Sequence, residues 1–190
     1  PLTVKEARSM LDGVFRDVDK STPSRVETVK GKPIVDIERL WYVYPEGPTA
    51  VKNISLKICK GEFIAVMGRN ASGKTTLVKH INGLLKPTKG QVIVDGIDTR
   101  KATIAELAQE VGFVFQNPND HLFADTVEEE IGFSLKNQGL QGGEIKQRVD
   151  EMLQRFRLED YRSQYPRSLS GGEKQRVALA SVLAIQPRIL

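Results

Sequence analysis

Hydrophobic and polar residues alternate in two neighbouring stretches of the chain. Ile34–Pro45 reads IVDIERLWYVYP, and after a short turn with Pro and Gly the run VKNISLKI follows at Val51–Ile58. Alternation with a period of two is typical of strands that bury one face. The pattern therefore predicts two antiparallel strands at the start of a folded domain, which we place at residues 34–190.

Continuous apolar runs follow this alternating region. GEFIAVMG is apolar throughout Phe63–Met67, and VGFVFQNP at residues 111–118 has the same character. Runs of this length bounded by Gly or Pro are expected for strands buried on both faces. Between them, TTLVKHINGLL predicts a helix from Thr75, QVIVDGIDT a strand with a tight Asp-Gly turn, and ATIAELAQE a short amphipathic helix.

The pattern changes to helical after residue 124. DTVEEEIGFSLKN opens with Thr126 and Glu129 at the spacing of a capping box. GEIKQRVDEMLQRFRL places one apolar stripe along a helix, made of Ile145, Val149, Met152, Leu153 and Phe156. We predict an inserted helical subdomain at about residues 124–170, and the overall class as α/β.

The first 33 residues have a different composition. DVDKSTPSRVETVKGKP is rich in charge, Ser, Thr and Pro, which indicates a linker after one short helix around Val4–Phe15. We therefore expect residues 1–33 to be an N-terminal extension of the domain.

Composition narrows the possible function classes. The net charge of +4 and the pI of 9.2 are mild, and no run of five basic residues occurs, so nucleic acid is not an expected partner. The one cysteine, Cys59, lies in an alternating segment and is expected to be a buried small side chain. No apolar run is long enough for a membrane helix and the first residues are too charged for a signal peptide, so we expect a reducing, cytoplasmic-side location.

GRNASGKT, at Gly68–Thr75, is the strongest candidate for chemistry. It matches the phosphate-binding pattern of Gly, four residues, then Gly-Lys-Ser/Thr, between a predicted strand and a predicted helix. Backbone N–H groups of the loop would bind phosphate, Lys74 would add a positive charge, and the Thr75 hydroxyl would ligate Mg²⁺. The predicted nucleotide-binding residues here are Gly68, Arg69, Asn70, Ala71, Ser72, Gly73, Lys74, Thr75 and Thr76. The alternative is a glycine-rich turn before a helix that contains a lysine by chance.

Two weaker candidates accompany this loop. Gln116 ends a predicted strand, where ligands bind in α/β sheets, although an ordinary polar strand end is at least as common. Ser170, Gly171, Gly172 and Glu173 form a second helix start that favours anions, and a well-capped helix is the alternative. The order of the motifs, with GRNASGKT first, then Gln116, the helical region and LSGGE, favours a functional reading of both.

In this order of motifs the chain resembles the nucleotide-binding domain of ATP-binding cassette (ABC) transporters over residues 34–190. GRNASGKT is similar to the Walker A loop of that family, Gln116 to its Q-loop, and LSGGE to its signature. The resemblance implies a P-loop core with an antiparallel β subdomain and an inserted helical subdomain. It also implies ATP and Mg²⁺ as ligands, Tyr44 stacked on adenine, Gln116 with catalytic and metal-binding roles, and Ser170, Gly171 and Gly172 on the nucleotide of a second cassette.

A narrower resemblance concerns VGFVFQNPNDHLFADTVEEEIGF. It is similar to the ATPases of energy-coupling factor importers, which take up vitamins and transition-metal ions. PLTVKEAR and the linker after it resemble the stretch before the second cassette in tandem members. Ala71 departs from the family, which usually has glycine at this position. Leu122 and Phe123 are apolar in a polar loop, which suits either docking of a membrane subunit or burial in the helical region.

The family also implies residues that we do not find in this chain. An aspartate and a catalytic glutamate end a strand soon after the signature helix, and a histidine follows later. The sequence ends at Leu190, at the start of that strand, and His80 and His121 match neither role. We therefore expect a truncated domain that binds ATP but does not hydrolyse it efficiently, whereas the full-length protein is an ATPase.

Three functions from different classes remain open at this stage. The first is the ATP-hydrolysing subunit or domain of a membrane importer for a vitamin or metal ion. It would lie peripherally on the cytoplasmic face, with a second cassette and transmembrane subunits as partners. The second is a soluble ABC ATPase that acts on nucleic acid or ribosomes. The third is a P-loop kinase or GTPase, which would leave LSGGE unexplained.

Overall fold

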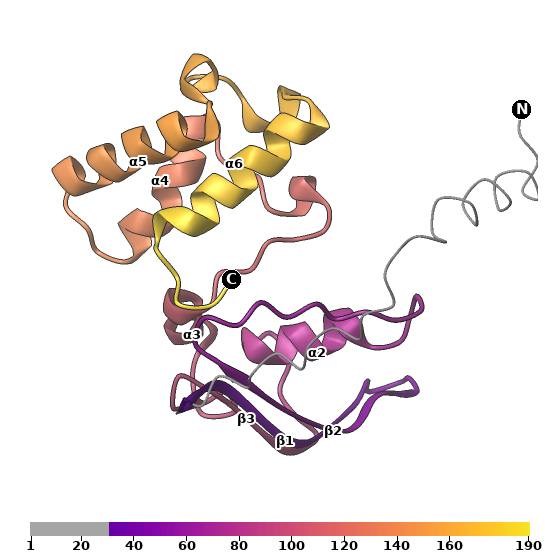
Figure 1. Cartoon of the computed structure of the whole chain (residues 1–190). Helices are drawn as coiled ribbons and strands as arrows, with labels where there is room; N and C mark the ends of the chain where they lie inside the picture. The colour runs from indigo at the N-terminus through magenta and orange to yellow at the C-terminus, as the bar shows by residue number, and fades with distance from the viewer. Residues whose placement is uncertain (1–30) are drawn as a thin grey trace, which may run out of the picture. The chain divides into compact units, whose positions relative to one another are not determined.

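The computed structural model describes residues 31–190. The helix expected around Val4–Phe15 and the linker that follows it lie outside the described residues. Figure 1 shows the described part as a sheet with nearby helices and a group of further helices.

A four-stranded antiparallel sheet forms the first part of this unit. It contains β1 (Pro33–Val43), β2 (Thr49–Cys59), β3 (Lys89–Val94) and β4 (Ile97–Asp98), in the order β2-β1-β3-β4. The two alternating stretches pair as predicted, with Val35 opposite Ile58 in β2 and opposite Val94 in β3.

The Asp-Gly turn between β3 and β4 also forms as predicted. Asp95 and Gly96 both have positive φ, 48° and 85°, which is the conformation of a type I′ hairpin turn.

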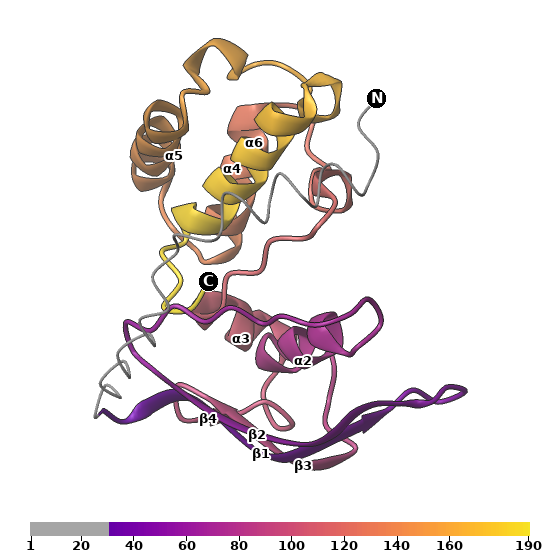
Figure 2. The same ribbon diagram turned by 45° about the vertical axis from the view of Figure 1, so that its right-hand side comes forward.

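Helices α2 (Lys74–Ile81) and α3 (Ile104–Glu110) lie on one face of the sheet, as Figure 2 shows. Buried side chains of β1, β2, β3 and α3 make a single core, which is completed by partly buried Leu77 and Ile81 of α2. Helix α3 begins with a full capping box between Thr103 and Glu106. This core fixes the start of α2, where the phosphate-binding motif ends.

A second core holds the helical region together. It lies among α4 (Val127–Asn137), α5 (Gly142–Phe156) and α6 (Gly171–Ala184), with single-turn 3₁₀ helices η1 (Pro118–Asp120), η2 (Glu159–Tyr161) and η3 (Pro166–Ser168) between them. The predicted stripe of α5 faces this core. Val149, Met152 and Leu153 are buried, and Ile145 and Phe156 pack against them.

Helix α4 has half of the capping box that its sequence predicts. The Thr126 hydroxyl accepts the Glu129 N–H at 3.2 Å, but no return bond from the Glu129 carboxylate to the Thr126 backbone is found in the described part of the chain. Three acidic residues in the first turn favour this end of the helix in any case.

The two strands predicted from continuous apolar runs are the main error of the sequence analysis. Phe63–Met67 has no strand structure and is exposed throughout, with Phe63 at 96%. The run after Val111 makes only one parallel bridge, between Val111 and Ile189. An apolar run favours burial, but a strand also needs neighbours for its N–H and C=O groups. Within residues 31–190, Phe63–Met67 makes no such backbone bonds.

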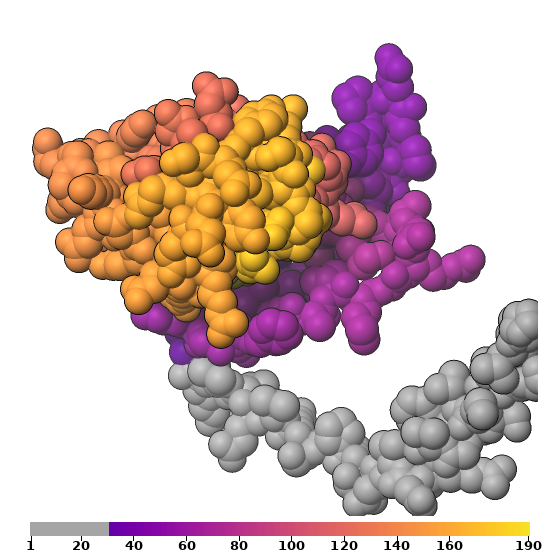
Figure 3. Space-filling view, turned by 90° about the horizontal axis from the view of Figure 1, so that it is seen from above, coloured from indigo at the N-terminus to yellow at the C-terminus, as the bar shows by residue number. Residues whose placement is uncertain are grey.

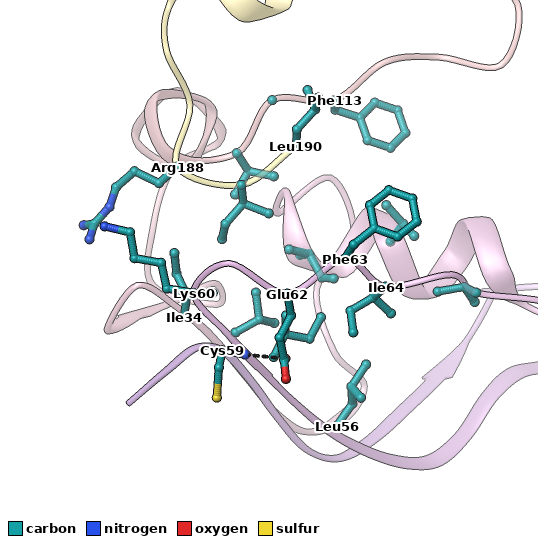
Figure 4. A pocket seen from close by; sticks show the side chains of 18 of the residues that line it. Ile34, Leu56, Cys59, Lys60, Glu62, Phe63, Ile64, Phe113, Arg188 and Leu190 are labelled. Atoms are coloured by element: carbon teal, nitrogen blue, oxygen red, sulfur yellow. Dashed lines mark hydrogen bonds between the residues drawn. The ribbon is translucent and has the colours of Figure 1, made fainter. Parts of the chain in front are cut away.

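An apolar cavity of 420 Å³ lies between these segments and the sheet (Figure 4). Phe63 and Ile64 line it together with Phe113 and Leu190, and Ile34 and Leu56 come from the sheet. Cys59 lies at its edge, only half-buried, and its N–H donates to the Glu62 carboxylate at 2.7 Å. The full burial predicted for Cys59 is therefore wrong.

Candidate functional site

The loop Gly68–Thr75 leads directly into α2. Gly73 caps the helix with φ 87°, and a Cβ at this position would lie 2.3 Å from the carbonyl oxygen of Ala50. Only glycine fits that contact and that backbone angle. The first N–H groups of α2 have no carbonyl partner within the helix, so they are free to bind an anion in front of it.

Ala71 has a left-handed backbone, with φ 61°. L-residues other than Asn and Asp rarely adopt this angle, which glycine adopts without strain. The sequence departs from the family pattern at this position, and the loop keeps a glycine-like conformation there nevertheless.

Lys74 lies across the loop. Its Nζ donates to the carbonyl oxygens of Gly68, at 2.9 Å, and Arg69, at 2.7 Å. Thr75 is exposed, whereas Thr76 is buried. The lysine cation, the Thr75 hydroxyl and the N-terminus of α2 thus face the same region, which suits a polyphosphate with its metal ion.

Tyr44 is brought beside this loop by the end of β1. A cavity of 320 Å³ is lined by Tyr44, by Pro48–Ala50 of the following turn and by Ala71–Thr76. The Tyr44 hydroxyl lies 3.2 Å from the Thr76 hydroxyl, and the ring is 38% exposed. An aromatic face and a phosphate-binding helix start therefore border one cavity.

Gln116 lies near the same helix from the other side. A second cavity, of 500 Å³, is lined by Thr75, Lys79 and Gln116 together with neighbours of Gln116 up to Asp120. The two residues predicted as Mg²⁺ ligands, Thr75 and Gln116, thus border one space and offer the oxygen atoms that Mg²⁺ prefers. No cluster of three or more His, Cys, Asp or Glu suited to a metal occurs among the described residues.

The segment after Gln116 is fixed to the helical region by polar contacts that the sequence analysis missed. The Glu130 carboxylate, 2% exposed, accepts the N–H groups of Phe123 and Ala124, both at 2.8 Å. Arg167 donates to the carbonyl of Leu122 at 2.8 Å. Glu130 lies three residues after buried Val127, so a charge on the apolar face of α4 was the available signal.

His121 joins this segment to α6. Its Nε2 lies 2.8 Å from the Ser181 hydroxyl, which itself donates to the Ala178 carbonyl at 3.0 Å. The hydroxyl proton is therefore used, and the imidazole is the donor in the first contact. Burial lowers the pKa of His121, and the nearby Glu130 charge opposes this shift.

Leu122 and Phe123 have different environments. Leu122 is fully buried in the helical core, so for this residue the burial alternative is correct. Phe123 is 55% exposed, and its ring contacts Phe133, 42% exposed, edge-on at 4.5 Å. An exposed aromatic pair remains beside the Gln116 loop.

The LSGGE segment forms the start of α6. Ser170 and Glu173 make the complete predicted capping box, and these contacts, with Tyr161 contributing, hold the pKa of Glu173 at about 2. Ser170, Gly171 and Gly172 are exposed, and α6 contributes to the surface in Figure 3. Neither cavity that contains loop residues is lined by these three residues. The structure thus does not bring the two predicted phosphate sites of this chain together.

Comparison with known proteins follows from this geometry. The ABC transporter family model matches residues 51–190. A putative ABC transporter ATP-binding protein of Caldanaerobacter subterraneus subsp. tengcongensis is 43% identical over 94% of this chain and 31% of its own length. The energy-coupling factor transporter ATP-binding protein EcfA of Methanothermobacter thermautotrophicus is 44% identical over 83% of this chain and 51% of its own.

Solved structures agree with this relationship. The cbiO1 protein of Clostridium perfringens, described as part of the ABC transporter complex cbiONQ, has a TM-score of 0.72 and 38% identity, over 83% of this chain and 63% of its own. The ATP-binding cassette MJ0796, solved as a dimer with ADP and Pi, has a TM-score of 0.70 and 35% identity, over 80% of this chain and 70% of its own. The predicted α/β cassette fold is therefore confirmed.

Two further facts limit what these comparisons establish. The chain spans from about a third to 60% of the length of the curated relatives that it matches first. Across residues 31–190, no helix is both long and apolar enough to cross a membrane. Since the family model covers most of the chain and the motifs occur in the expected order, the chain belongs to the ABC transporter family.

Proposed function

We propose that this chain is the ATP-binding part of a membrane importer of the energy-coupling factor type. The observation that carries the proposal is the cavity in which Tyr44 and the phosphate-binding loop meet. Its aromatic side suits a nucleobase, and its helix start and lysine suit a polyphosphate. ATP offers both groups in one molecule.

Each part of the loop has a role in this proposal. Backbone N–H groups of Gly68–Gly73 and of the first turn of α2 bind the β-phosphate, and Lys74 leaves its two carbonyl partners to bind the β- and γ-phosphates. Thr76 supports Tyr44 through its hydroxyl.

Mg²⁺ fits the oxygen donors that border the second cavity, namely the Thr75 hydroxyl and the Gln116 side-chain carbonyl. When bound, the ion neutralises charge that develops on the phosphates during hydrolysis. Gln116 is exposed and lies at the start of the segment that Glu130 holds, so it connects the nucleotide to the helical region.

Hydrolysis is proposed for the full-length protein, at a site shared by two cassettes. Ser170, Gly171 and Gly172 are exposed at a helix start, and a Cβ on either glycine would meet nothing within 4 Å. Nothing in the described chain requires glycine there, although glycine weakens a helix by roughly 0.5–1 kcal/mol relative to alanine. Close approach of the γ-phosphate held by a second cassette is a reason for both glycines, and the MJ0796 cassette was solved as a dimer.

The relatives support the transport role and its partners. Several are named energy-coupling factor ATP-binding proteins, and cbiO1 belongs to a complex with membrane subunits in its title. A vitamin or a transition-metal ion is the proposed cargo, and the cytoplasmic face of the membrane is the proposed location. Phe123 and Phe133 are the proposed contact for a transmembrane subunit because they form an exposed aromatic pair beside the Gln116 loop.

A tandem arrangement is part of the proposal. The relative from Caldanaerobacter matches over 94% of the chain, so its match includes part of the segment before Gly31, and it is about three times as long as the matched region. Both facts suit a second cassette in a two-cassette protein, whose partner would then lie in the same polypeptide.

Lys74→Ala in the full-length protein tests the nucleotide site. A charge-assisted contact to phosphate is worth about 1.5–3 kcal/mol, so ATP affinity at this site should fall roughly ten- to a hundredfold. Calorimetric titration with ATP and Mg²⁺ measures it, with Lys79→Ala, one helical turn further along α2, as the control. Equal ATP affinity in wild type and Lys74→Ala would refute the proposal, and copurification with membrane subunits tests the transport role separately.

A further inference from the structure

Tyr44 does not stand alone beside the phosphate-binding loop. Tyr42, two residues earlier on the same face of β1, lies edge-on to the Tyr44 ring, with ring centres 4.8 Å apart at 86°. Tyr42 also lies edge-on to the ring of His80, again at 4.8 Å, at 75°. One tyrosine thus contacts two other rings at the distance and angle that aromatic pairs prefer.

Polar contacts close this arrangement through α2. The Tyr44 hydroxyl lies 3.2 Å from the Thr76 hydroxyl, and the Thr76 carbonyl accepts a hydrogen bond from His80 Nδ1 at 2.7 Å. Thr76 and His80 are one helical turn apart and both are buried. Tyr44, Thr76, His80 and Tyr42 therefore form a closed ring of four contacts, which we call the aromatic ring cluster.

His80 is an unusual residue for this position. Its side chain is fully buried, and its Nε2 has no hydrogen-bond partner within residues 31–190. Burial lowers its pKa, while the Thr76 and Lys86 backbones oppose the shift, so the ring is neutral near pH 7. An apolar side chain would avoid the unpaired nitrogen, so what histidine contributes is a flat ring against Tyr42 with a donor for Thr76.

We propose that Tyr42 and His80 are positioning residues for the nucleobase. They hold the Tyr44 ring at a fixed angle to the first turn of α2, so that base stacking and phosphate binding occur together. This rests on the proposed function, because Tyr44 must contact the base. Neither Tyr42 nor His80 lines the cavity that Tyr44 shares with the loop, so both act through Tyr44 and Thr76.

The test compares two ligands in the full-length protein. ATP and inorganic tripolyphosphate are titrated by calorimetry with Mg²⁺, since the second ligand lacks the base. Tyr42→Leu should lower ATP affinity about two- to tenfold, the range of one lost aromatic pair, and leave tripolyphosphate affinity unchanged. Tyr42→Phe keeps the ring and should behave as wild type. Thr76→Val should lower ATP affinity, and Thr76→Ser should restore it.

A double variant gives the decisive comparison. If Tyr42 acts through Tyr44, then Tyr42→Leu has no further effect on ATP affinity once Tyr44 is alanine. A merely structural role predicts equal losses for both ligands and additive losses in the double variant, and either result would overturn the inference. An unchanged ATP affinity in Tyr44→Ala would instead refute the base-stacking assignment itself.

Discussion

Gly171→Asp separates a helix cap from a site that acts between two cassettes. Gly171 is the first residue of α6, after the Ser170 cap, and is exposed. A side chain on it would meet nothing within 4 Å, and its backbone is not in the left-handed region. The substitution therefore adds a carboxylate to the face that we propose meets the γ-phosphate of another cassette, without a clash in its own chain.

The expected effect on stability is small and favourable. Replacing a helical glycine gains about 0.5–1 kcal/mol, a negative charge near a helix N-terminus gains about 0.3–1 kcal/mol, and the weak helix propensity of Asp offsets up to about 0.7 kcal/mol. Glu173, ionised in the same turn with a pKa of about 2, opposes the new charge. The free energy of unfolding should therefore stay the same or rise by up to about 1 kcal/mol.

The expected effect on turnover is large. Two unit charges about 4 Å apart repel by about 4 kcal/mol at a partly screened site, which corresponds to roughly a thousandfold in rate. The ATPase rate of the full-length protein should fall by about this factor. ATP affinity should stay near that of wild type, because the phosphate-binding loop of the same chain is untouched.

Helix α5 supplies a matched control for this experiment. Its start reads Gln-Gly-Gly-Glu, its Gly142 is likewise exposed and free of neighbours within 4 Å, and the Glu144 carboxylate accepts the Gln141 N–H at 3.3 Å. Gly142→Asp should change stability as Gly171→Asp does and leave turnover intact. Wild-type turnover in Gly171→Asp, or equal turnover losses in both variants, would refute the proposed site.

Three further predictions concern other parts of the chain. Ala71→Gly relieves a left-handed alanine, so ATP affinity should be retained and unfolding free energy should change by at most about 1 kcal/mol; calorimetry and urea unfolding check this. Burial lowers the pKa of His121 below the ordinary 6.5, so the unfolded chain binds more protons and stability should fall as pH drops from about 7 to 5. His121→Gln, which keeps a donor for Ser181 but cannot titrate, should reduce that fall, and urea midpoints at several pH values that match wild type would contradict this. Phe123→Asp, next to Phe133, should weaken copurification or transport coupling with little change in stability, and normal assembly and transport would count against the docking role.

Patterns that are satisfied within a few residues were predictable from the sequence. The β1–β2 pair, the Asp95–Gly96 turn, the stripe of α5 and the Ser170 capping box all depend on local periodicity or local hydrogen bonds. The loop motif also placed Lys74 correctly at the start of a helix, since its spacing encodes a turn geometry.

Features that depend on distant partners were not predictable in the same way. Phe63–Met67 has the composition of a buried strand, but composition does not supply the neighbouring backbone on which a strand depends. Glu130 and the aromatic ring cluster were missed because their partners lie on other elements. His80 was judged only by whether it matched a family role, and its contact with Tyr42 follows from packing of α2 beside β1.

The glycines of this chain show why a shared site is difficult to derive from one polypeptide. Gly73 is required by its own chain, because the Ala50 carbonyl would lie 2.3 Å from any Cβ there. Gly171 and Gly142 face no neighbour at all, and both begin a helix with a glutamate two residues further on, after a second glycine. Stereochemistry within the chain therefore gives the same answer for the proposed signature site and for an ordinary helix start. What distinguishes them must come from a surface that approaches from outside, which is why turnover of the paired protein, and not stability of this domain, is the measurement that decides the role of Gly171.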